Sequence, residues 1–371
     1  MSVFFKNDYD EQKIQKCETC NKKLGLNDIE TRFRHNNVIF VYSVPKVGST
    51  SIVSSLRLFC FFGYVIIHIH DEIMFQVLTN INTNDISIVD IINYNLSYLK
   101  RNVVVIDIYR NPIEHKISTY FEKLGCIHFN IQDDKVDKLL KTETIIQRFN
   151  RIFPYLCNED IFYDKFELKE DIQFNFENKY LLYKKNNLRI LKLRLMDSKD
   201  WASILNKVLG INIVILKDHT TTNKKYKNTY TQFKKNYRIP ENFLSIVSND
   251  KYFTYYLSLK ERQEYLNEWE QKKTNEFLQI MTENEYKLYM EISLENQQYS
   301  FIDTTHYLYN GCTCKGCLFK RQNVIKELMK IKNSGINNIN EIDYSRFQIK
   351  HDEANKELAK QKFNSVIKRL K

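Results

Sequence analysis

Lys46 and Gly48 stand two residues apart in the segment PKVGSTS (45–51), and three hydroxyl side chains follow them directly. A lysine supplies a positive charge, a glycine lets the backbone approach a ligand closely, and hydroxyl groups donate hydrogen bonds. Together these groups can hold a phosphate group, although a tight turn with a solvated lysine has the same pattern. The hydroxyl residues are Ser49, Thr50 and Ser51.

The order of these residues excludes one class of phosphate loop. In a Walker A motif the lysine follows the second glycine, with the spacing G-x-x-x-x-G-K-[ST]. This spacing occurs nowhere in the chain, and here Lys46 precedes Gly48. An ordinary ATPase or GTPase is therefore not expected.

A second set of phosphate-binding residue types lies about sixty residues further on. The apolar run 102–109 predicts a buried strand, Arg110 follows it, and Pro112 suits the first turn of a helix. Ser118 lies about two helical turns after Arg110 and can face the same way. A guanidinium matches the fork of a phosphate better than an ammonium does. An ion pair between Arg110 and Glu114 is the alternative interpretation.

His68 and His70 alternate with isoleucines in GYVIIHIHDEIMF (63–75), so on a strand both point to the same side. A histidine, whose ordinary pKa is about 6.5, can take the proton of a hydroxyl group. His70 lies nearer to the carboxyl end of the strand and is the first candidate for such a base, with His68 and Glu72 as alternates. Two core histidines, or a metal site built from H-x-H-D, are the other interpretations.

Apolar runs predict the strands that position these side chains, near residues 38–44, 64–70, 103–109, 188–196 and 211–217. Helical patterns follow the first and third runs, and apolar residues recur at helical spacing from residue 258 onward. Strands that alternate with helices predict an α/β fold, with a mainly parallel sheet and helices on both faces. Ligands of such sheets bind at the carboxyl ends of the strands, where both clusters lie.

The two clusters resemble the donor-binding motifs of sulfotransferases that use 3′-phosphoadenosine 5′-phosphosulfate (PAPS). PKVGSTS is similar to their 5′-phosphosulfate loop, P-K-x-G-[ST]-[ST]-[ST], and R-N-P followed by Ser118 is similar to their 3′-phosphate site. With the H-x-H strand and the tyrosine-rich segments that follow, the chain looks closest to the capsular polysaccharide synthesis family of sulfotransferase-like proteins. The resemblance covers roughly residues 38–270. It implies a P-loop-like sheet, here with a helical C-terminal extension.

The resemblance also implies a role for each motif residue. Lys46 would stabilise the leaving oxygen of PAPS, the backbone and hydroxyls of 48–51 would hold its 5′-phosphate, and Arg110 with Ser118 would hold its 3′-phosphate. His70 would deprotonate a hydroxyl acceptor, with a carbohydrate as the expected class. Steroid and phenol sulfotransferases close over the 3′-phosphate with an R-K-G triplet, which this chain lacks. The candidates for that role are Lys224, Lys225 and Lys227.

Two functions of other classes fit the same residues. An atypical P-loop kinase would bind ATP with Mg²⁺ and would not need the 3′-phosphate for which Arg110 is expected. A catalytically silent nucleotide-binding or scaffold protein would keep the fold without turnover. Sulfuryl transfer itself needs no metal ion, so a dependence on Mg²⁺ would favour the kinase.

The composition is that of a large, basic, globular chain. Its 371 residues are 43% hydrophobic, enough for a sizeable core. The formal net charge of +11 suits an anionic donor and an acidic polysaccharide or nucleic acid, although lysine-rich chains are often simply well solvated. The interleaved arginine and aromatic residues typical of single-strand nucleic-acid binding are absent. No stretch has the form of a signal peptide or a membrane span, so a cytoplasmic protein is expected. We expect an N-terminal cysteine-containing arm (1–36), a sulfotransferase-like α/β domain (37–270) and a helical C-terminal region (271–371).

Five of the eight cysteines lie near the two ends of the chain. Cys17 and Cys20 form a C-x₂-C turn like that of a zinc knuckle, and Cys314 with Cys317 would complete a four-cysteine structural zinc site. Such a site would join the two ends of the chain, because nearly 300 residues separate the pairs. Unliganded thiols and a disulfide are the alternatives, and a reducing compartment disfavours the disulfide.

Overall fold

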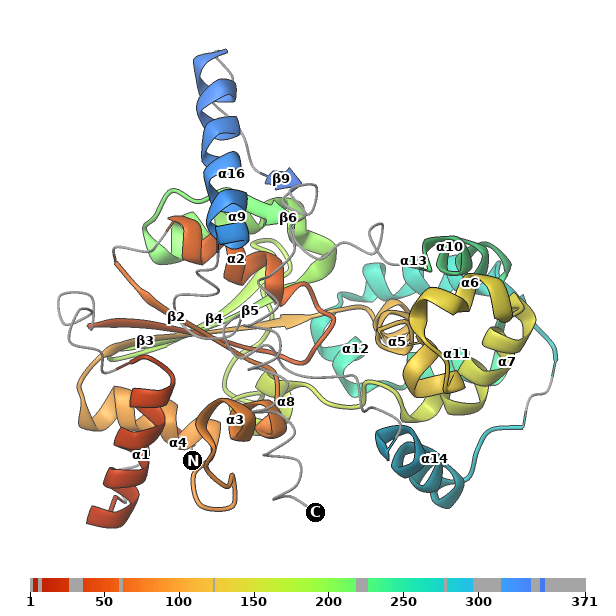
Figure 1. Ribbon diagram of the computed structural model, residues 1–371, viewed down its shortest axis with the longest axis horizontal. Helices are drawn as coiled ribbons and strands as arrows, with labels where there is room; N and C mark the ends of the chain where they lie inside the picture. Colours follow the sequence, from red (N-terminus) through yellow and green to blue (C-terminus); the bar gives the residue numbers. More distant parts are fainter. Residues whose placement is uncertain are drawn as a thin grey trace. The chain divides into compact units, whose positions relative to one another are not determined.

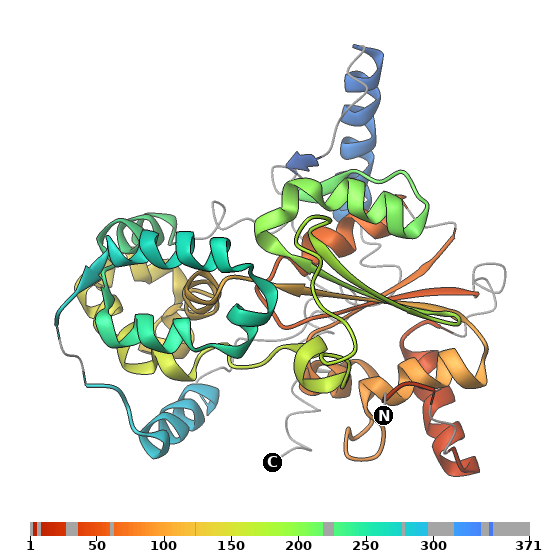
Figure 2. The ribbon, with the colours of Figure 1, turned by 180° about the vertical axis from the view of Figure 1, so that it is seen from behind.

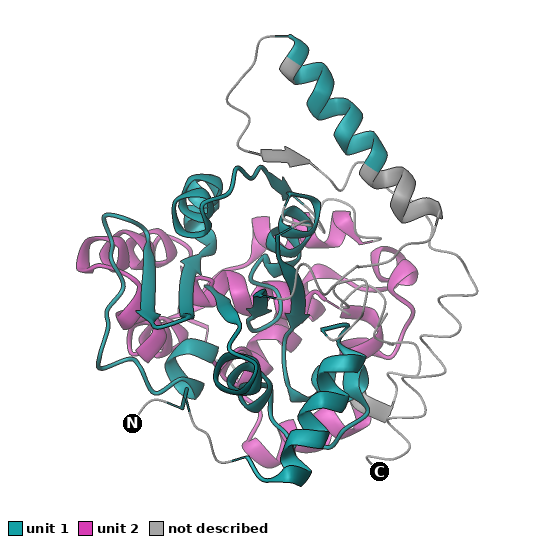
Figure 3. Cartoon of the chain, turned by 90° about the vertical axis from the view of Figure 1, so that its left-hand side faces the viewer, with its two compact units in different colours: residues 1–108, 160–219, 301–371 teal, residues 109–159, 220–300 magenta. Residues whose placement is uncertain are grey.

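The computed structural model describes residues 3–5, 9–26, 36–59, 63–122, 124–217, 226–276, 279–295, 315–334 and 341–343. Figure 1 labels the helices and strands, and Figure 2 shows the chain from behind. The chain forms two compact units: unit 1 comprises residues 1–108, 160–219 and 301–371, and unit 2 comprises 109–159 and 220–300 (Figure 3). Unit 1 thus combines parts of all three segments expected from the sequence.

A five-stranded sheet forms the centre of unit 1, with the strand order β2-β1-β3-β5-β4. The strands are β1 (Asn37–Tyr42), β2 (Val65–Ile69), β3 (Asn102–Tyr109), β4 (Tyr180–Lys185) and β5 (Leu188–Arg194). β1 pairs parallel with both β2 and β3, whereas β4 and β5 are antiparallel. The expected α/β fold with a mainly parallel sheet is confirmed.

The central strands are the continuous Val- and Ile-rich runs, which suit strands that are buried on both faces. β4 was not expected from the sequence, because only Leu181 of its six residues is buried. As an edge strand it ends in two exposed lysines, which discourage pairing with another chain. β6 (Ile215–Lys217) lies in the expected run 211–217, but it pairs parallel with β9 (Glu341–Asp343) and does not extend the main sheet.

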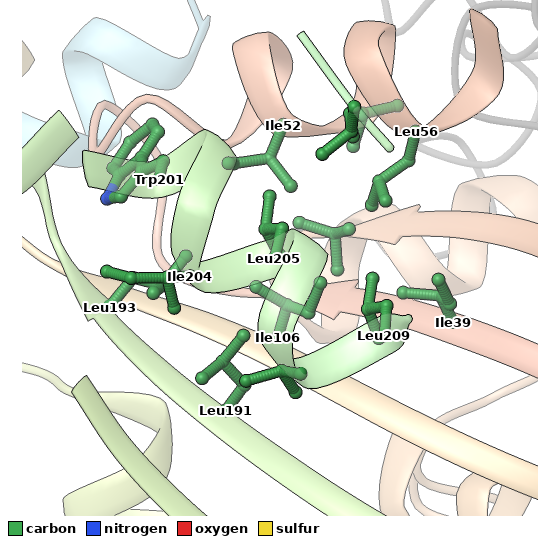
Figure 4. Close-up of a cluster of buried hydrophobic side chains, with 14 of the residues drawn as sticks. Ile39, Ile52, Leu56, Ile106, Leu191, Leu193, Trp201, Ile204, Leu205 and Leu209 are labelled. Carbon is green, nitrogen blue, oxygen red and sulfur yellow. The ribbon is translucent and has the colours of Figure 1, made fainter. Parts of the chain in front are cut away.

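Helices cover both faces of this sheet, as expected (Figure 1). One face carries α2 (Ser49–Phe59) and α9 (Trp201–Leu209), and the other carries α1 (Glu11–Lys23), α3 (Glu72–Thr79), α4 (Ile88–Asn93) and α8 (Ile161–Lys165). In Figure 4, Ile52 of α2 and Leu205 of α9 point toward the strand residues Ile106 and Leu191, all buried in one cluster. α16 (Lys315–Asn333) packs through Val324 against Leu216.

Unit 2 is almost entirely helical. Its elements are α5 (Pro112–Tyr120), α6 (Val136–Leu139), α7 (Thr142–Ile152), α10 (Lys227–Asn236), β7 (Ile239–Pro240), α11 (Glu241–Ser248), α12 (Lys251–Tyr256), α13 (Leu259–Glu270), β8 (Lys273–Thr274) and α14 (Glu283–Glu295). Aromatic rings make its core, with Phe149 in edge-to-face contact with Phe153, Phe233 and Tyr237. None of the helices in the described ranges of either unit has the length and apolarity that crossing a membrane requires.

Candidate functional site

The loop between β1 and α2 has two residues in the left-handed region, Lys46 with a φ of 68° and Gly48 with a φ of 92°. A non-glycine residue in this region costs about 1–2 kcal/mol. Such strain persists only where the surrounding structure holds it, and it gathers at ligand-binding turns. Turns of this kind bring successive backbone N–H groups to one side, where they form a concavity that binds anions.

Four backbone N–H groups of this segment find no acceptor among the described residues, those of Val47, Gly48, Ser49 and Thr50. α2 begins at Ser49, so the last two lie in the first turn of the helix, where N–H groups have no intrahelical partner. The positive end of the helix dipole lies at the same place. A phosphate or another small anion is the ligand that this arrangement suits.

The three hydroxyl groups of the loop are not equivalent. Ser49 is buried, and its Oγ lies 3.2 Å from Nε2 of His68, beneath the loop. Thr50 and Ser51 are half-buried and stay candidates for donating to a ligand. The first residue of α2 thus offers a ligand its backbone N–H, while its side chain fastens the helix to β2.

A methyl group at residue 48 is expected to destabilise the protein. A Cβ on Gly48 would lie 2.9 Å from Cδ1 of Leu195 and 3.1 Å from Cη2 of Trp201, and the φ of 92° would be strained as well. Gly48→Ala should therefore lower the free energy of unfolding by about 2–5 kcal/mol, the sum of left-handed strain and overpacking.

Gly210 provides the control for this experiment, because its φ of 71° is also left-handed and its Cβ would meet no atom within 4 Å. Gly210→Ala should cost only the strain, about 1–2 kcal/mol. Urea denaturation of both variants measures the difference. Equal losses would mean that Leu195 and Trp201 move aside without cost.

His68 and His70 lie on one side of the sheet, as predicted, with ring centroids 4.5 Å apart in an edge-to-face arrangement. Nδ1 of His70 lies 2.8 Å from the carbonyl oxygen of Ser43. A carbonyl can only accept, so Nδ1 carries the proton, and in the neutral ring Nε2 carries the lone pair. His70 is half-buried whereas His68 is fully buried, so the structure favours His70 as a base for an external hydroxyl group.

Glu72, the alternate base, forms an ion pair instead. Its carboxylate accepts hydrogen bonds from Nζ of Lys165 at 2.7 and 2.9 Å and from the hydroxyl of Tyr42 at 3.2 Å. Burial raises the pKa of Glu72, but the bond and charge of Lys165 outweigh burial and lower it below its usual value. A carboxylate held ionised in this way is a poor proton acceptor.

Arg110 and Ser118 both belong to unit 2. Arg110 directly follows the last residue of β3, and Ser118 lies on α5, which begins with Pro112 as predicted. Burial lowers the pKa of the Arg110 guanidinium, while the neighbouring Tyr230 and Glu114 act in the opposite direction. Glu114 is therefore close enough to act on Arg110, while its carboxylate accepts a hydrogen bond from the Tyr265 hydroxyl at 2.6 Å. The ion pair of the alternative interpretation stays a prediction.

Ser118 is 9% exposed, and its hydroxyl forms no hydrogen bond within the described ranges. A nearly buried hydroxyl without an internal partner is a suitable donor for a ligand, since unsatisfied polar groups are costly. Lys227, one candidate for the missing triplet, is exposed at the start of α10. Lys224 and Lys225 lie outside the described residues.

Sequence reasoning missed two buried lysines. Lys116 is 4% exposed, and its Nζ donates to the carbonyl oxygen of Leu156 and to Oδ1 of Asn158. Burial lowers the pKa of Lys116. Lys192 lies at the centre of a buried charge cluster with Asp107 and Asp160. The signal in both cases was a lysine that interrupts an apolar face, at KIS in α5 and at ILKL in β5.

The cysteine pair near the N-terminus does not form the expected turn. Cys17 and Cys20 lie on one buried face of α1, and burial raises the pKa of each thiol to about 12, which disfavours the thiolate that binds zinc. Within the described residues there is no group of three or more His, Cys, Asp or Glu side chains arranged to hold a metal ion. Cys314 and the side chain of Cys317 lie outside the described part, so the four-cysteine zinc site stays a prediction.

Comparisons with known proteins identify no relative of this chain. The functional conclusion therefore depends on the loop 45–51, on His70 and on Arg110. No protein-family model, no curated protein and no solved structure matches the chain.

Proposed function

We propose that this protein is a sulfotransferase that moves the sulfuryl group of PAPS to a hydroxyl group, with a carbohydrate as the acceptor class. The observation that carries the proposal is the loop 45–51. It combines Lys46 and Gly48 in left-handed conformations with four backbone N–H groups that have no acceptor in the described part of the chain. A lysine placed before the glycine, in P-K-x-G-[ST]-[ST]-[ST], is the feature that separates this loop from a Walker A loop.

The topology of the sheet supports a P-loop-like fold. The strand order is β2-β1-β3, so the chain passes from β1 to β2 on one side and then returns to β3 on the other side of β1. The direction of the connections therefore reverses between β1 and β3. In open α/β sheets, ligands bind at the carboxyl ends of the strands at such a reversal. The loop 45–51 leaves the carboxyl end of β1, and Arg110 leaves that of β3. The two expected phosphate sites therefore follow the two strands that flank the reversal.

In the proposed reaction the chain's own groups position the reactants and balance charge. His70 accepts the proton of the acceptor hydroxyl on Nε2, because the carbonyl of Ser43 keeps the proton of the ring on Nδ1. The acceptor oxygen forms its bond to sulfur as the bond from sulfur to the phosphate oxygen breaks. Lys46 stabilises the negative charge that develops on that leaving oxygen, and the N–H groups of the loop hold the 5′-phosphate. Arg110 and Ser118 hold the 3′-phosphate.

Calorimetric titration with adenosine 3′,5′-bisphosphate tests the proposal, with 5′-AMP and ATP–Mg²⁺ as comparison ligands. We expect the bisphosphate to bind at least about tenfold more tightly than 5′-AMP, a difference of about 1.4 kcal/mol. The 3′-phosphate is the only group that distinguishes these two ligands. A preference for ATP–Mg²⁺ would favour the kinase, and no binding of any nucleotide would contradict the proposal.

Arg110→Gln sharpens this test, because it removes the guanidinium that is proposed to bind the 3′-phosphate. The variant should bind the bisphosphate and 5′-AMP with similar affinity, since only the 3′-phosphate contact is lost. Arg238→Gln is the matched control, an exposed arginine on the same unit whose partners among the described residues are the backbone carbonyls of Lys235 and Tyr237. Equal effects of both substitutions would mean that Arg110 has no specific role.

A further inference from the structure

His68 is a buried polar side chain on an otherwise aliphatic face of the sheet. It follows Ile66 on the face of β2 that α2 covers, and its partner in the register of β1 is Val41. The ring is fully buried. A valine or isoleucine would fill this position without the cost of desolvating an imidazole. A histidine here needs an explanation beyond packing.

The first contact of His68 is with the phosphate loop. Its Nε2 lies 3.2 Å from Oγ of Ser49, and Ser49 is the first residue of α2. This bond joins β2, in the sheet, to Ser49, whose backbone N–H lies with that of Thr50 in the first turn of α2. The His68–Ser49 bond therefore helps to determine where α2 begins and where its first N–H groups point.

The second contact of His68 is with the proposed base. The His68 and His70 rings meet edge to face at 4.5 Å. His70 is also held by the bond from its Nδ1 to the carbonyl of Ser43. The ring plane of His70 is thus fixed from two directions, by a hydrogen bond on one nitrogen and by the ring of His68.

We propose that His68 is a positioning residue that joins the phosphate loop to the base: it holds the start of α2 through Ser49 and the ring plane of His70 through ring contact. This inference rests on the proposed function, since it assigns roles within the same site. His68 itself touches neither reactant, because its side chain is covered. One buried residue thereby sets the geometry of both the donor and the acceptor ends of the reaction.

Two substitutions at residue 68 separate the two contacts. His68→Phe keeps a ring against His70 and loses the bond to Ser49, whereas His68→Gln keeps a group that can bond to Ser49 and loses the ring. Ser49→Ala removes the same bond from the other side and alters no core ring. The probes are calorimetry with adenosine 3′,5′-bisphosphate and the ¹⁵N signals of the His70 ring, which report which nitrogen carries the proton.

We expect His68→Phe and Ser49→Ala each to weaken bisphosphate binding about tenfold, the effect of one lost hydrogen bond that positions the loop. The double variant should be no weaker than either single variant, because both remove the same bond. His68→Gln should keep the affinity within about twofold of the unmodified protein, while the His70 signals move toward the average of the two tautomers.

Other results would overturn the proposal. Unchanged affinity in both His68→Phe and Ser49→Ala, or additive losses in the double variant, would show that the bond does not shape the loop. Unchanged His70 signals in His68→Gln would show that the ring contact positions nothing. If the unmodified protein binds no bisphosphate, the proposed function fails. The ¹⁵N signals of His70 then still decide whether His68 positions that ring.

Discussion

Lys46→Ala is expected to lower kcat for sulfuryl transfer about 10²–10³-fold, the effect of removing one group that stabilises a developing oxyanion. The charge of Lys46 matters most when the leaving oxygen becomes negative, so the loss should fall on kcat more than on binding of the bisphosphate product. Conversion of PAPS to the bisphosphate, with water or a sugar as acceptor, measures kcat. Calorimetry measures the affinity.

Lys100→Ala is the matched control for this experiment. Lys100 is also a lysine with a positive φ, 54°, but it precedes β3 and so lies at the amino end of the sheet. Both substitutions replace a lysine in the left-handed region, so their backbone effects should be similar. Lys46→Ala with turnover equal to that of Lys100→Ala would contradict the role of Lys46. Partial activity in Lys46→Arg would confirm that a positive charge is what the position requires.

The central strands could be predicted from the sequence because their apolar runs are unbroken. β1, β2 and β3 consist mostly of Val, Ile and Phe, and such strands are stable where both faces of the sheet are covered by helices. β4 could not be found in the same way, since it is an edge strand with one buried side chain and is held by its hairpin with β5. Short or half-exposed strands depend on their neighbours for stability, and local sequence does not contain those neighbours.

The division into two units could not be predicted, because each unit combines distant parts of the chain. Residues 109–159 and 220–300 together form unit 2, where Phe149 of one segment contacts Phe233 and Tyr237 of the other. Aromatic residues are spread through the whole sequence, so nothing in their spacing shows which of them meet. Contacts between residues so far apart depend on the topology.

At the site, the sequence identified the loop but not its internal geometry. The motif placed Ser49 among the ligand donors, whereas helix geometry turns its hydroxyl toward His68. At Cys17 and Cys20, the C-x₂-C spacing predicted a turn, although the same segment carries ordinary helix signals. Asp10 caps the helix, and the same spacing of three residues puts both thiols on one helical face.

Lys192→Met is expected to lower the free energy of unfolding at pH 8 by about 3–5 kcal/mol, because it leaves two buried carboxyl groups without a cation. Nζ of Lys192 donates to Oδ2 of Asp107 at 2.6 Å and to Oδ2 of Asp160, and none of the three side chains is more than 4% exposed. Asp107 lies just before the segment 109–159 leaves unit 1, and Asp160 begins the return. The ammonium group of Lys192 on β5 therefore binds a carboxylate at each end of the segment 109–159.

The cluster also predicts how stability depends on pH. Burial raises the pKa of Asp107 to about 7, although the charge of Lys192 acts in the opposite direction. An unfolded aspartate has a pKa of about 3.9, so between these values the folded protein binds more protons than the unfolded chain. The contribution of Asp107 is therefore greatest below about pH 4 and is lost as the pH rises through about 7. Asp107→Asn should flatten this dependence, because an amide does not titrate.

Urea denaturation at pH 5.5 and at pH 8 tests both expectations on the same variants. Lys179→Met is the matched control, since Lys179 makes a 2.7 Å ion pair with Asp200 in which both side chains are more than 40% exposed. Removing that pair should cost far less, because water replaces the lost partner. The loss in Lys192→Met should shrink at pH 5.5, where buried carboxylates can take up a proton instead of keeping an unpaired charge. If Lys192→Met is no less stable than Lys179→Met at pH 8, the buried cluster does not hold the two ends of the segment 109–159. The packing around β5 would then hold them.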